Sequence, residues 1–265
     1  MLPELSTLGP DVPLTPLTYA RRAEPAELPE LMDGPLPYAV IREYLGDLAK
    51  VNRFTHGYKP TLAFLDRIAG HDECGPACSI EHRNSARPLR ILDVGSGGGD
   101  TLRAVAHWAA ARNVAVELTG IDLNPLSTRA AEEFSAKDPS AAHINWRTAD
   151  VFSYSPNPEP DIVLSALFTH HLSTSEIVRF LRWMEQHARL GWYINDLHRS
   201  HSAAFFFRFL PILLGWHNFI GHDGAVSLRR SFVPEDWKRM LSQANIATAS
   251  IEQHPMSRLC VARIR

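Results

Sequence analysis

The sequence is poor in cysteine and has no marked excess of charge of either sign. Its 265 residues include 3 cysteines, which excludes a small disulfide-stabilised scaffold and favours a reducing compartment. We therefore expect a cytoplasmic protein. Lys and Arg number 27 against 29 Asp and Glu, a net charge of −2, so no general attraction for nucleic acid is expected.

Long hydrophobic runs are also missing. The most apolar stretch, residues 203–216, contains Arg208 and Pro211 and is shorter than the roughly 20 residues that a membrane-spanning helix needs. The first residues lack a basic segment followed by an apolar one, so no secretory signal and no membrane span are expected. Because 45% of the residues are hydrophobic, a folded domain with a sizeable core is predicted.

Three parts of the chain differ in composition. Residues 1–36 are rich in proline and predict an extended or disordered arm with little chemistry. Residues 37–87 predict two helices split near Gly57 and followed by a polar loop, which together form a helical cap. Residues 88–265 are assigned to one larger domain, with a lid insertion around residues 199–232.

Short apolar runs alternate with amphipathic segments in this larger part. Strands are predicted over residues 89–94, 114–121, 144–148, 162–168 and 191–197, and helices over residues 101–112, 126–136 and 177–188. Such alternation predicts an α/β fold with a doubly wound, mostly parallel sheet and helices on both faces. A helix opened by Pro234 and an antiparallel pair over 247–253 and 259–264 are expected to complete it.

A glycine-dense turn follows the first predicted strand. The segment reads I-L-D-V-G-S-G-G-G-D-T over residues 91–101. Glycines allow positive φ angles and let backbone N–H groups approach a ligand at the start of the next helix. The dinucleotide fingerprint G-x-G-x-x-G requires a third glycine at position 100, where this chain has Asp100.

The acidic residue before the turn gives the pattern D-x-G-x-G-x-G, which resembles the first motif of class I S-adenosylmethionine-dependent methyltransferases. The resemblance implies a Rossmann-like fold with a seven-stranded sheet and S-adenosylmethionine as cofactor. It also implies that the turn holds the methionine part of the cofactor, with the acidic residue near its ammonium group. The residues concerned are Asp93, Gly95, Ser96 and Gly97, with Gly99 and Thr101 as secondary candidates.

Three later segments resemble the remaining motifs of the same family, in the same order. The resemblance places Asp122 on the ribose hydroxyls and Leu123 against adenine, and Asp150, next to Val151, near the adenine amino group. The segment around Ser165 resembles the strand that passes beneath the reactive sulfonium. In the alternative interpretation, each aspartate is only a turn former or a helix cap. Four motifs in sequence favour the cofactor site.

Two histidines follow the fourth-strand motif. A histidine is easily tuned to act as a general base near neutral pH, so His171 and then His170 are the catalytic candidates. The alternative is that both side chains only pack the turn. Candidates for substrate binding are Arg53, Tyr58, Asn195, His222 and Asp223. Residues 37–69 and 203–216 are expected to roof the strand ends and exclude water.

A possible zinc site contains His71, Cys74, Cys78 and His82. Their spacing departs from the usual C-x-x-C zinc loops, so we expect no bound metal.

The sequence thus predicts a methyltransferase acting on a small, largely apolar acceptor, aromatic or polyketide-like, most simply by O-methylation with a histidine base. A C-methyltransferase of quinone-like aromatics and a non-catalytic S-adenosylmethionine-binding partner subunit are the alternatives. A nucleic-acid methyltransferase is disfavoured, because the fourth-strand segment reads S-A-L-F over residues 165–168 and not N/D-P-P-Y. A monomer or a homodimer is expected.

Overall fold

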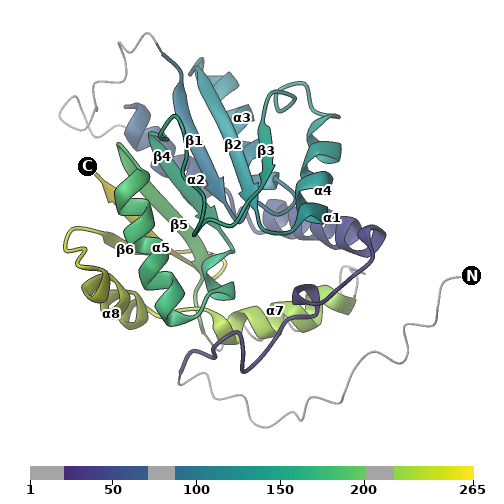
Figure 1. Ribbon diagram of the computed structural model, residues 1–265, viewed down its shortest axis with the longest axis vertical. Helices are drawn as coiled ribbons and strands as arrows, with labels where there is room; N and C mark the ends of the chain where they lie inside the picture. Colours follow the sequence, from purple (N-terminus) through teal and green to yellow (C-terminus); the bar gives the residue numbers. More distant parts are fainter. Residues whose placement is uncertain (1–20, 71–86, 201–217) are drawn as a thin grey trace, which may run out of the picture.

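The computed structural model describes residues 21–70, 87–200 and 218–265. It contains a seven-stranded sheet with the strand order β3-β2-β1-β4-β5-β7-β6 (Figure 1). The strands are β1 (Leu89–Val94), β2 (Val116–Asp122), β3 (Asn145–Thr148), β4 (Ile162–Ala166), β5 (Gly191–Leu197), β6 (Ser250–His254) and β7 (Arg258–Ile264). Strands β1 to β5 are parallel, and β7 runs antiparallel to both β5 and β6.

This architecture confirms the predicted α/β fold and its strand and helix succession. The helices that follow β1, β2 and β4 are α3 (Asp100–Arg112), α4 (Pro125–Ser135) and α5 (Thr174–His187), and α8 (Pro234–Ala244) precedes the final antiparallel pair. The predicted strand at residues 162–168 ends earlier, because Leu167 has a positive φ of 52° and the chain turns there.

Both faces of the sheet are covered, which explains the near-continuous apolar runs of its central strands. In β1, Leu92 and Val94 face a core that includes α5 and α8, whereas Ile91 faces a second core that includes α3. Successive side chains of a strand point to opposite faces, so one apolar run supplies both cores. The charged Asp93 therefore lies within the same buried strand, at 1% exposure.

The N-terminal helices are present where the sequence predicted them, as α1 (Tyr38–Phe54) and α2 (Lys59–Ala69). Helix α1 packs on α4. Helix α2 packs against the sheet instead: Phe64 is fully buried, and its ring stacks on Tyr193 of β5 with centroids 4.6 Å apart. The second helix is therefore part of the main hydrophobic core.

The described part of the N-terminal arm differs from the extended, chemically inert segment that its prolines predicted. Residues 21–36 include the short 3-10 helix η2 (Leu31–Asp33) and run beside α7 (Asn218–Arg230) (Figure 1). Arg22 Nε donates to the Arg230 carbonyl at 2.7 Å, and Leu31 N–H donates to Asp223 Oδ1 at 3.0 Å. Buried polar contacts, which composition does not reveal, hold the arm in place.

Within the described ranges, no helix is long and apolar enough to span a membrane. The possible zinc ligands (His71, Cys74, Cys78 and His82) and the apolar stretch 203–216 lie outside the described residues.

We predict that Phe64→Ala lowers the free energy of unfolding by about 3–5 kcal/mol, because it removes a fully buried aromatic ring from the core. Lys59→Ala, at an exposed position of the same helix, is the control and should change stability by less than about 0.5 kcal/mol. Urea denaturation of both variants measures this. A small effect for Phe64→Ala would contradict the assignment of α2 to the core.

Candidate active site

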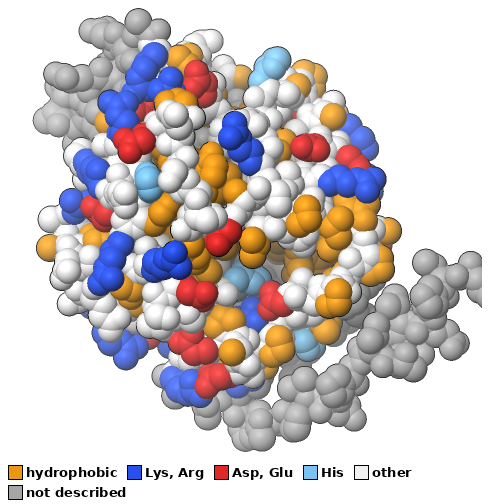
Figure 2. Space-filling model, in the orientation of Figure 1, with side chains coloured by type: hydrophobic (Ala, Val, Ile, Leu, Met, Phe, Trp, Pro, Cys, Tyr) orange, Lys and Arg blue, Asp and Glu red, His pale blue; other side chains and the backbone are white. Residues whose placement is uncertain are grey.

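A cavity of about 630 Å³ lies at the carboxyl ends of the parallel strands. Ligands of open α/β sheets bind at this edge. Figure 2 shows a hollow in one face of the molecule, with histidine and acidic side chains beside it. Helix α1 and the arm close the cavity with Met32, Tyr44, Leu48 and Val51, whereas no residue of α2 lines it. Of the predicted roof over residues 37–69, only α1 therefore lines the cavity. Among the described residues, the arm and α7, through Gly224 and Ser227, line it as well.

The turn between β1 and α3 has the backbone geometry that its glycines suggested. Gly95 and Gly97 have φ angles of 71° and 51°, in the region that favours glycine. A Cβ atom at Gly95 would lie 2.3 Å from the Phe168 ring, so only glycine fits there. The N–H of Gly97 donates to Asp122 Oδ2 at 2.8 Å, which joins the turn to the end of β2.

Asp93 is a deeply buried acidic residue of the cavity wall. Its side chain is 1% exposed, and its Oδ1 atom has no hydrogen-bond partner. Burial, together with the nearby charges of Asp100 and Asp122, raises the pKa of Asp93 well above its usual range. A positively charged ligand group beside this carboxylate would lower its pKa and satisfy the unpartnered oxygen.

The ends of β2 and β3 contribute further polar and apolar groups. Asp122 accepts hydrogen bonds from the N–H groups of Gly97 and Asn124, and burial raises its pKa. Leu123 is 72% exposed although it is a large apolar side chain. Asp150 is exposed and accepts from the N–H of Phe152 at 2.9 Å. All three predicted residues line the cavity.

His170 belongs to the 3-10 turn η5 (Thr169–His171), which follows β4 and leads into α5. Its Nδ1 atom lies 2.7 Å from Asp196 Oδ1, and Thr169 Oγ1 donates to Asp196 Oδ2 at 2.6 Å. Burial opposes ionisation of Asp196, but His170 and these hydrogen bonds hold the pKa of this carboxyl well below its usual range. An ionised Asp196 only accepts, so His170 Nδ1 is the donor in this contact, and Nε2 is the ring nitrogen that faces away from Asp196.

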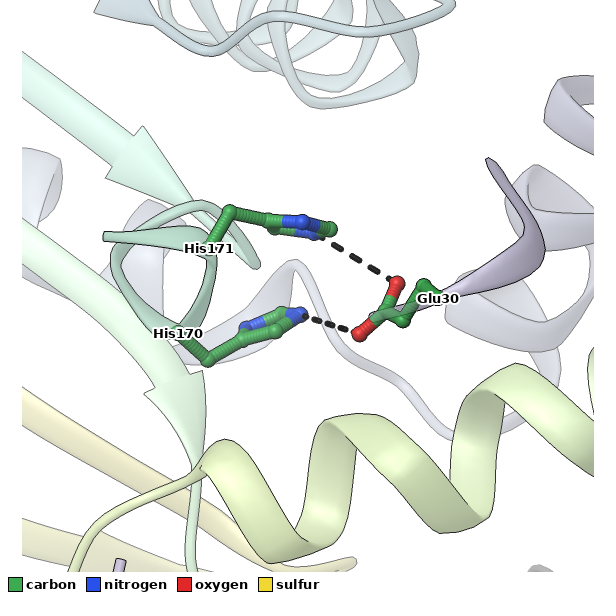
Figure 3. Close-up of side chains that lie close together, drawn as sticks. All are labelled: Glu30, His170 and His171. Carbon is green, nitrogen blue, oxygen red and sulfur yellow. Dashed lines mark ion pairs between the residues drawn. The ribbon is translucent and has the colours of Figure 1, made fainter. Parts of the chain in front are cut away.

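His171 is held by two acidic groups of the arm, of which Figure 3 shows Glu30. Its Nδ1 lies 3.3 Å from Asp33 Oδ1, and its Nε2 lies 3.8 Å from Glu30 Oε2. Burial disfavours the charged ring, and so does the neighbouring Arg230. The hydrogen bond to Asp33 and the negative charges of Glu30 and Asp33 outweigh the effects of burial and of Arg230. The pKa of His171 is therefore raised.

Glu30 connects the two histidines and was missed by the sequence analysis. Its Oε1 atom lies 3.8 Å from His170 Nε2, so both rings point at one carboxylate (Figure 3). Arg230 Nη1 lies 3.2 Å from the same oxygen, and Ser227 Oγ donates to it at 2.8 Å. No periodic pattern surrounds Glu30 in the proline-rich arm, so only the fold reveals its position.

Glu30, His170 and His171 are also the group of described side chains whose ligand atoms lie close enough to hold a metal ion. However, Glu30 is already paired with the buried guanidinium of Arg230 and accepts from Ser227. A metal ion would have to compete with this cation. The arrangement therefore favours an ion-pair network in which Arg230, and not a metal ion, is the cation beside Glu30.

The structure brings most of the predicted site residues together. Lining the cavity are Asp93, Gly95, Ser96, Gly97, Thr101, Asp122, Leu123, Asp150, Val151, His170 and His171. Gly99 does not line it, and Ser165 Oγ instead donates to the Val94 carbonyl at 3.1 Å, linking β4 to β1.

The five predicted substrate-binding residues do not line the cavity. Arg53 is exposed, and Tyr58 Oη donates to Asp100 Oδ2 at 2.7 Å. Asn195 Nδ2 donates to the Gly57 carbonyl and to Thr61, tying β5 to α2.

The remaining two, His222 and Asp223, interact with each other at 3.0 Å, and Asp223 accepts from the N–H groups of Leu31 and Met32. These contacts hold the arm against α7 and thereby position Glu30 and Asp33.

Residues 91–191 match the family model described as a methyltransferase domain. This match and the strand order given above agree in giving this part of the chain the fold of a class I methyltransferase domain. A search among curated proteins finds no match.

Several solved structures share the fold. The magnesium protoporphyrin IX methyltransferase of Synechocystis PCC 6803, solved with bound SAH, superposes with a TM-score of 0.51 at 13% identity, covering 88% of this chain and 89% of that protein. The plantazolicin methyltransferase BpumL gives a TM-score of 0.59 at 12% identity, covering 86% and 96%.

A presumed O-methyltransferase from Nostoc punctiforme PCC 73102 gives a TM-score of 0.51 at 16% identity, covering 69% of this chain. The chain spans 54% of that protein, about half of its length. At these identities the similarities establish the fold alone.

We predict that the stability contributed by His171 depends on pH. Its folded-state pKa is raised, so the attraction between the protonated ring and Asp33 and Glu30 is fully present below the unfolded pKa of about 6.5 and is lost as the pH rises through the folded pKa. His171→Gln should therefore destabilise the protein more at about pH 6 than at about pH 9.

Urea denaturation at both pH values measures this difference, with the exposed His143→Gln as control. An equal loss at the two pH values would show that the ring acts only by packing.

Proposed function

We propose that this protein transfers the methyl group of S-adenosylmethionine to a small, largely apolar acceptor, aromatic or polyketide-like, and that the acceptor atom is a hydroxyl oxygen. The cavity of about 630 Å³ has the size of a small-molecule site. Its polar edge along the strand ends suits the cofactor, and its apolar side on α1 and the arm, with Met32, Tyr44, Leu48 and Val51, suits the acceptor.

The residues proposed to hold the cofactor follow the order of the strands. Asp93 supplies the buried carboxylate for its ammonium group, and the Gly95–Gly97 turn brings backbone N–H groups close to its methionine part. Asp122 keeps acceptor capacity for the ribose hydroxyls, because each of its oxygens accepts one hydrogen bond. Leu123 offers an exposed apolar side chain to adenine, and Asp150 offers an exposed carboxylate to the adenine amino group.

The observation that carries the proposed chemistry is the pairing of His170 with Asp196 at the cavity wall. When bound, the cofactor supplies a methyl group on a positively charged sulfur, and the carbon of this methyl group accepts an oxygen lone pair while the sulfur departs as a neutral thioether. Nε2 of His170 takes the proton of the acceptor hydroxyl, and the Asp196 carboxylate stabilises the imidazolium that forms. The sequence favoured His171 as the base, but its raised pKa keeps that ring protonated to a higher pH.

The experiment is methyl transfer to a panel of phenols and enolic polyketide analogues by the His170→Asn variant. We expect kcat to fall by about 10²- to 10⁴-fold, with the Kd for S-adenosylhomocysteine changed less than about threefold. His143→Asn, an exposed histidine outside the cavity, is the matched control and should retain full activity. An unchanged kcat in His170→Asn would remove the histidine base.

The same assay distinguishes the alternatives. A product methylated on a ring carbon would indicate a C-methyltransferase of quinone-like aromatics. Wild-type protein that binds S-adenosylhomocysteine but methylates no member of the panel would favour a non-catalytic partner subunit.

A further inference from the structure

Arg258 carries a buried positive charge that the cofactor motifs do not explain. It is the first residue of β7, where it pairs with Leu197 at the end of β5, so it lies at the same edge of the sheet as the cavity. The residue is 5% exposed and lines the cavity. Its position near the C-terminus places it far outside the family match at residues 91–191.

Within the described part of the chain, no carboxylate forms an ion pair with Arg258. Its Nη2 donates to the side-chain oxygen of Asn52 at 2.7 Å, a neutral partner, and its Nε has no partner. Burial lowers the pKa of this guanidinium. The charges of Asp196 and Asp100 favour the charged guanidinium, but neither carboxylate contacts it directly. A buried charge without a direct ion pair is unfavourable, and an anionic ligand group in contact with it would compensate this cost.

Neighbouring residues hold the guanidinium in this position. The amide of Asn52 turns its oxygen to Arg258 and its nitrogen to Asp100 Oδ2, at 2.9 Å. The absence of a side chain at Gly57 leaves room for the guanidinium in this position, because a Cβ atom there would lie 2.5 Å from Arg258 Nη2. Arg258 is therefore positioned by its surroundings.

Asp93 places an acidic group in the same cavity, and it too has an unpartnered polar atom. Asn52 joins Arg258 to Asp100, the first residue of α3, and the strand that carries Asp93 leads through the glycine turn into the same helix. Both residues line the cavity on this side, around the start of α3. An unpaired carboxylate and an unpaired guanidinium in one region together complement a zwitterion that carries an ammonium and a carboxylate on one carbon.

We propose that Arg258 binds the α-carboxylate of the methionine part of the cofactor, opposite the ammonium that Asp93 faces, and so selects ligands with an intact amino-acid end. This inference rests on the proposed cofactor site. It adds a cofactor-binding residue from β7, the last strand in the sequence, and it gives Asn52 the role of positioning that residue.

The test compares three neutral-sulfur ligands by calorimetry: S-adenosylhomocysteine, its decarboxylated analogue, which keeps the amine, and 5′-methylthioadenosine, which lacks both groups. In Arg258→Met, the affinity for S-adenosylhomocysteine should fall about 10- to 100-fold, because a charged hydrogen-bonded partner is lost. The affinities for the other two ligands should change less than about threefold. Asp93→Asn should instead weaken both amine-bearing ligands and spare 5′-methylthioadenosine.

Arg263→Met, on the same strand but outside the cavity, is the matched control and should bind all three ligands as the wild type does. Because the three ligands are compared on one preparation, a partly unfolded variant does not change the ratio of their affinities. An equal loss for all three ligands in Arg258→Met, or no loss for any, would overturn the proposal. Wild-type protein that binds none of them would instead contradict the cofactor site itself.

Discussion

The structure depends on the burial of charge at the carboxyl edge of a parallel sheet. Asp93 lies near the end of a central strand covered on both faces, and its side chain is 1% exposed although it lines the cavity. Such a group needs a positively charged partner or a proton. The glycine turn, the ends of β2 and β3, and the guanidinium of Arg258 surround the cavity where a ligand would supply that partner.

A second network of charges joins the N-terminal arm to the proposed chemistry. Asp223 holds the backbone of Leu31 and Met32, and this places Glu30 and Asp33 beside the histidine pair. The Arg230 guanidinium lies between the two acidic residues, 3.2 Å from Glu30 and 2.7 Å from Asp33. The arm thus closes the cavity and also sets the electrostatic environment of His171.

Local sequence signals predicted the sheet, and they placed most of the candidate cofactor residues at one edge of it. The strand limits of β1 and the start of α3 follow from an apolar run that breaks into glycines, which is a short-range pattern. The four aspartate- and serine-bearing motifs follow successive strands, and parallel strands bring their carboxyl ends to one edge. Most of the predicted cofactor residues therefore line one cavity.

The remaining features depend on contacts between distant parts of the chain. Glu30 is 140 residues from His170, and Arg258 is 206 residues from Asn52, so no local pattern joins either pair. The sequence could not show that Asn195 and Asp223 use their polar atoms to hold α2 and the arm. It also could not rank the two histidines, because their carboxylate partners come from β5 and from the arm.

The most direct measurement is a crystal structure grown with S-adenosylhomocysteine at saturating concentration. The account predicts that the ligand occupies this cavity, with its ribose on Asp122 and its amino-acid end between Asp93 and Arg258. A ligand bound elsewhere, or a cavity that stays empty at saturation, would contradict it.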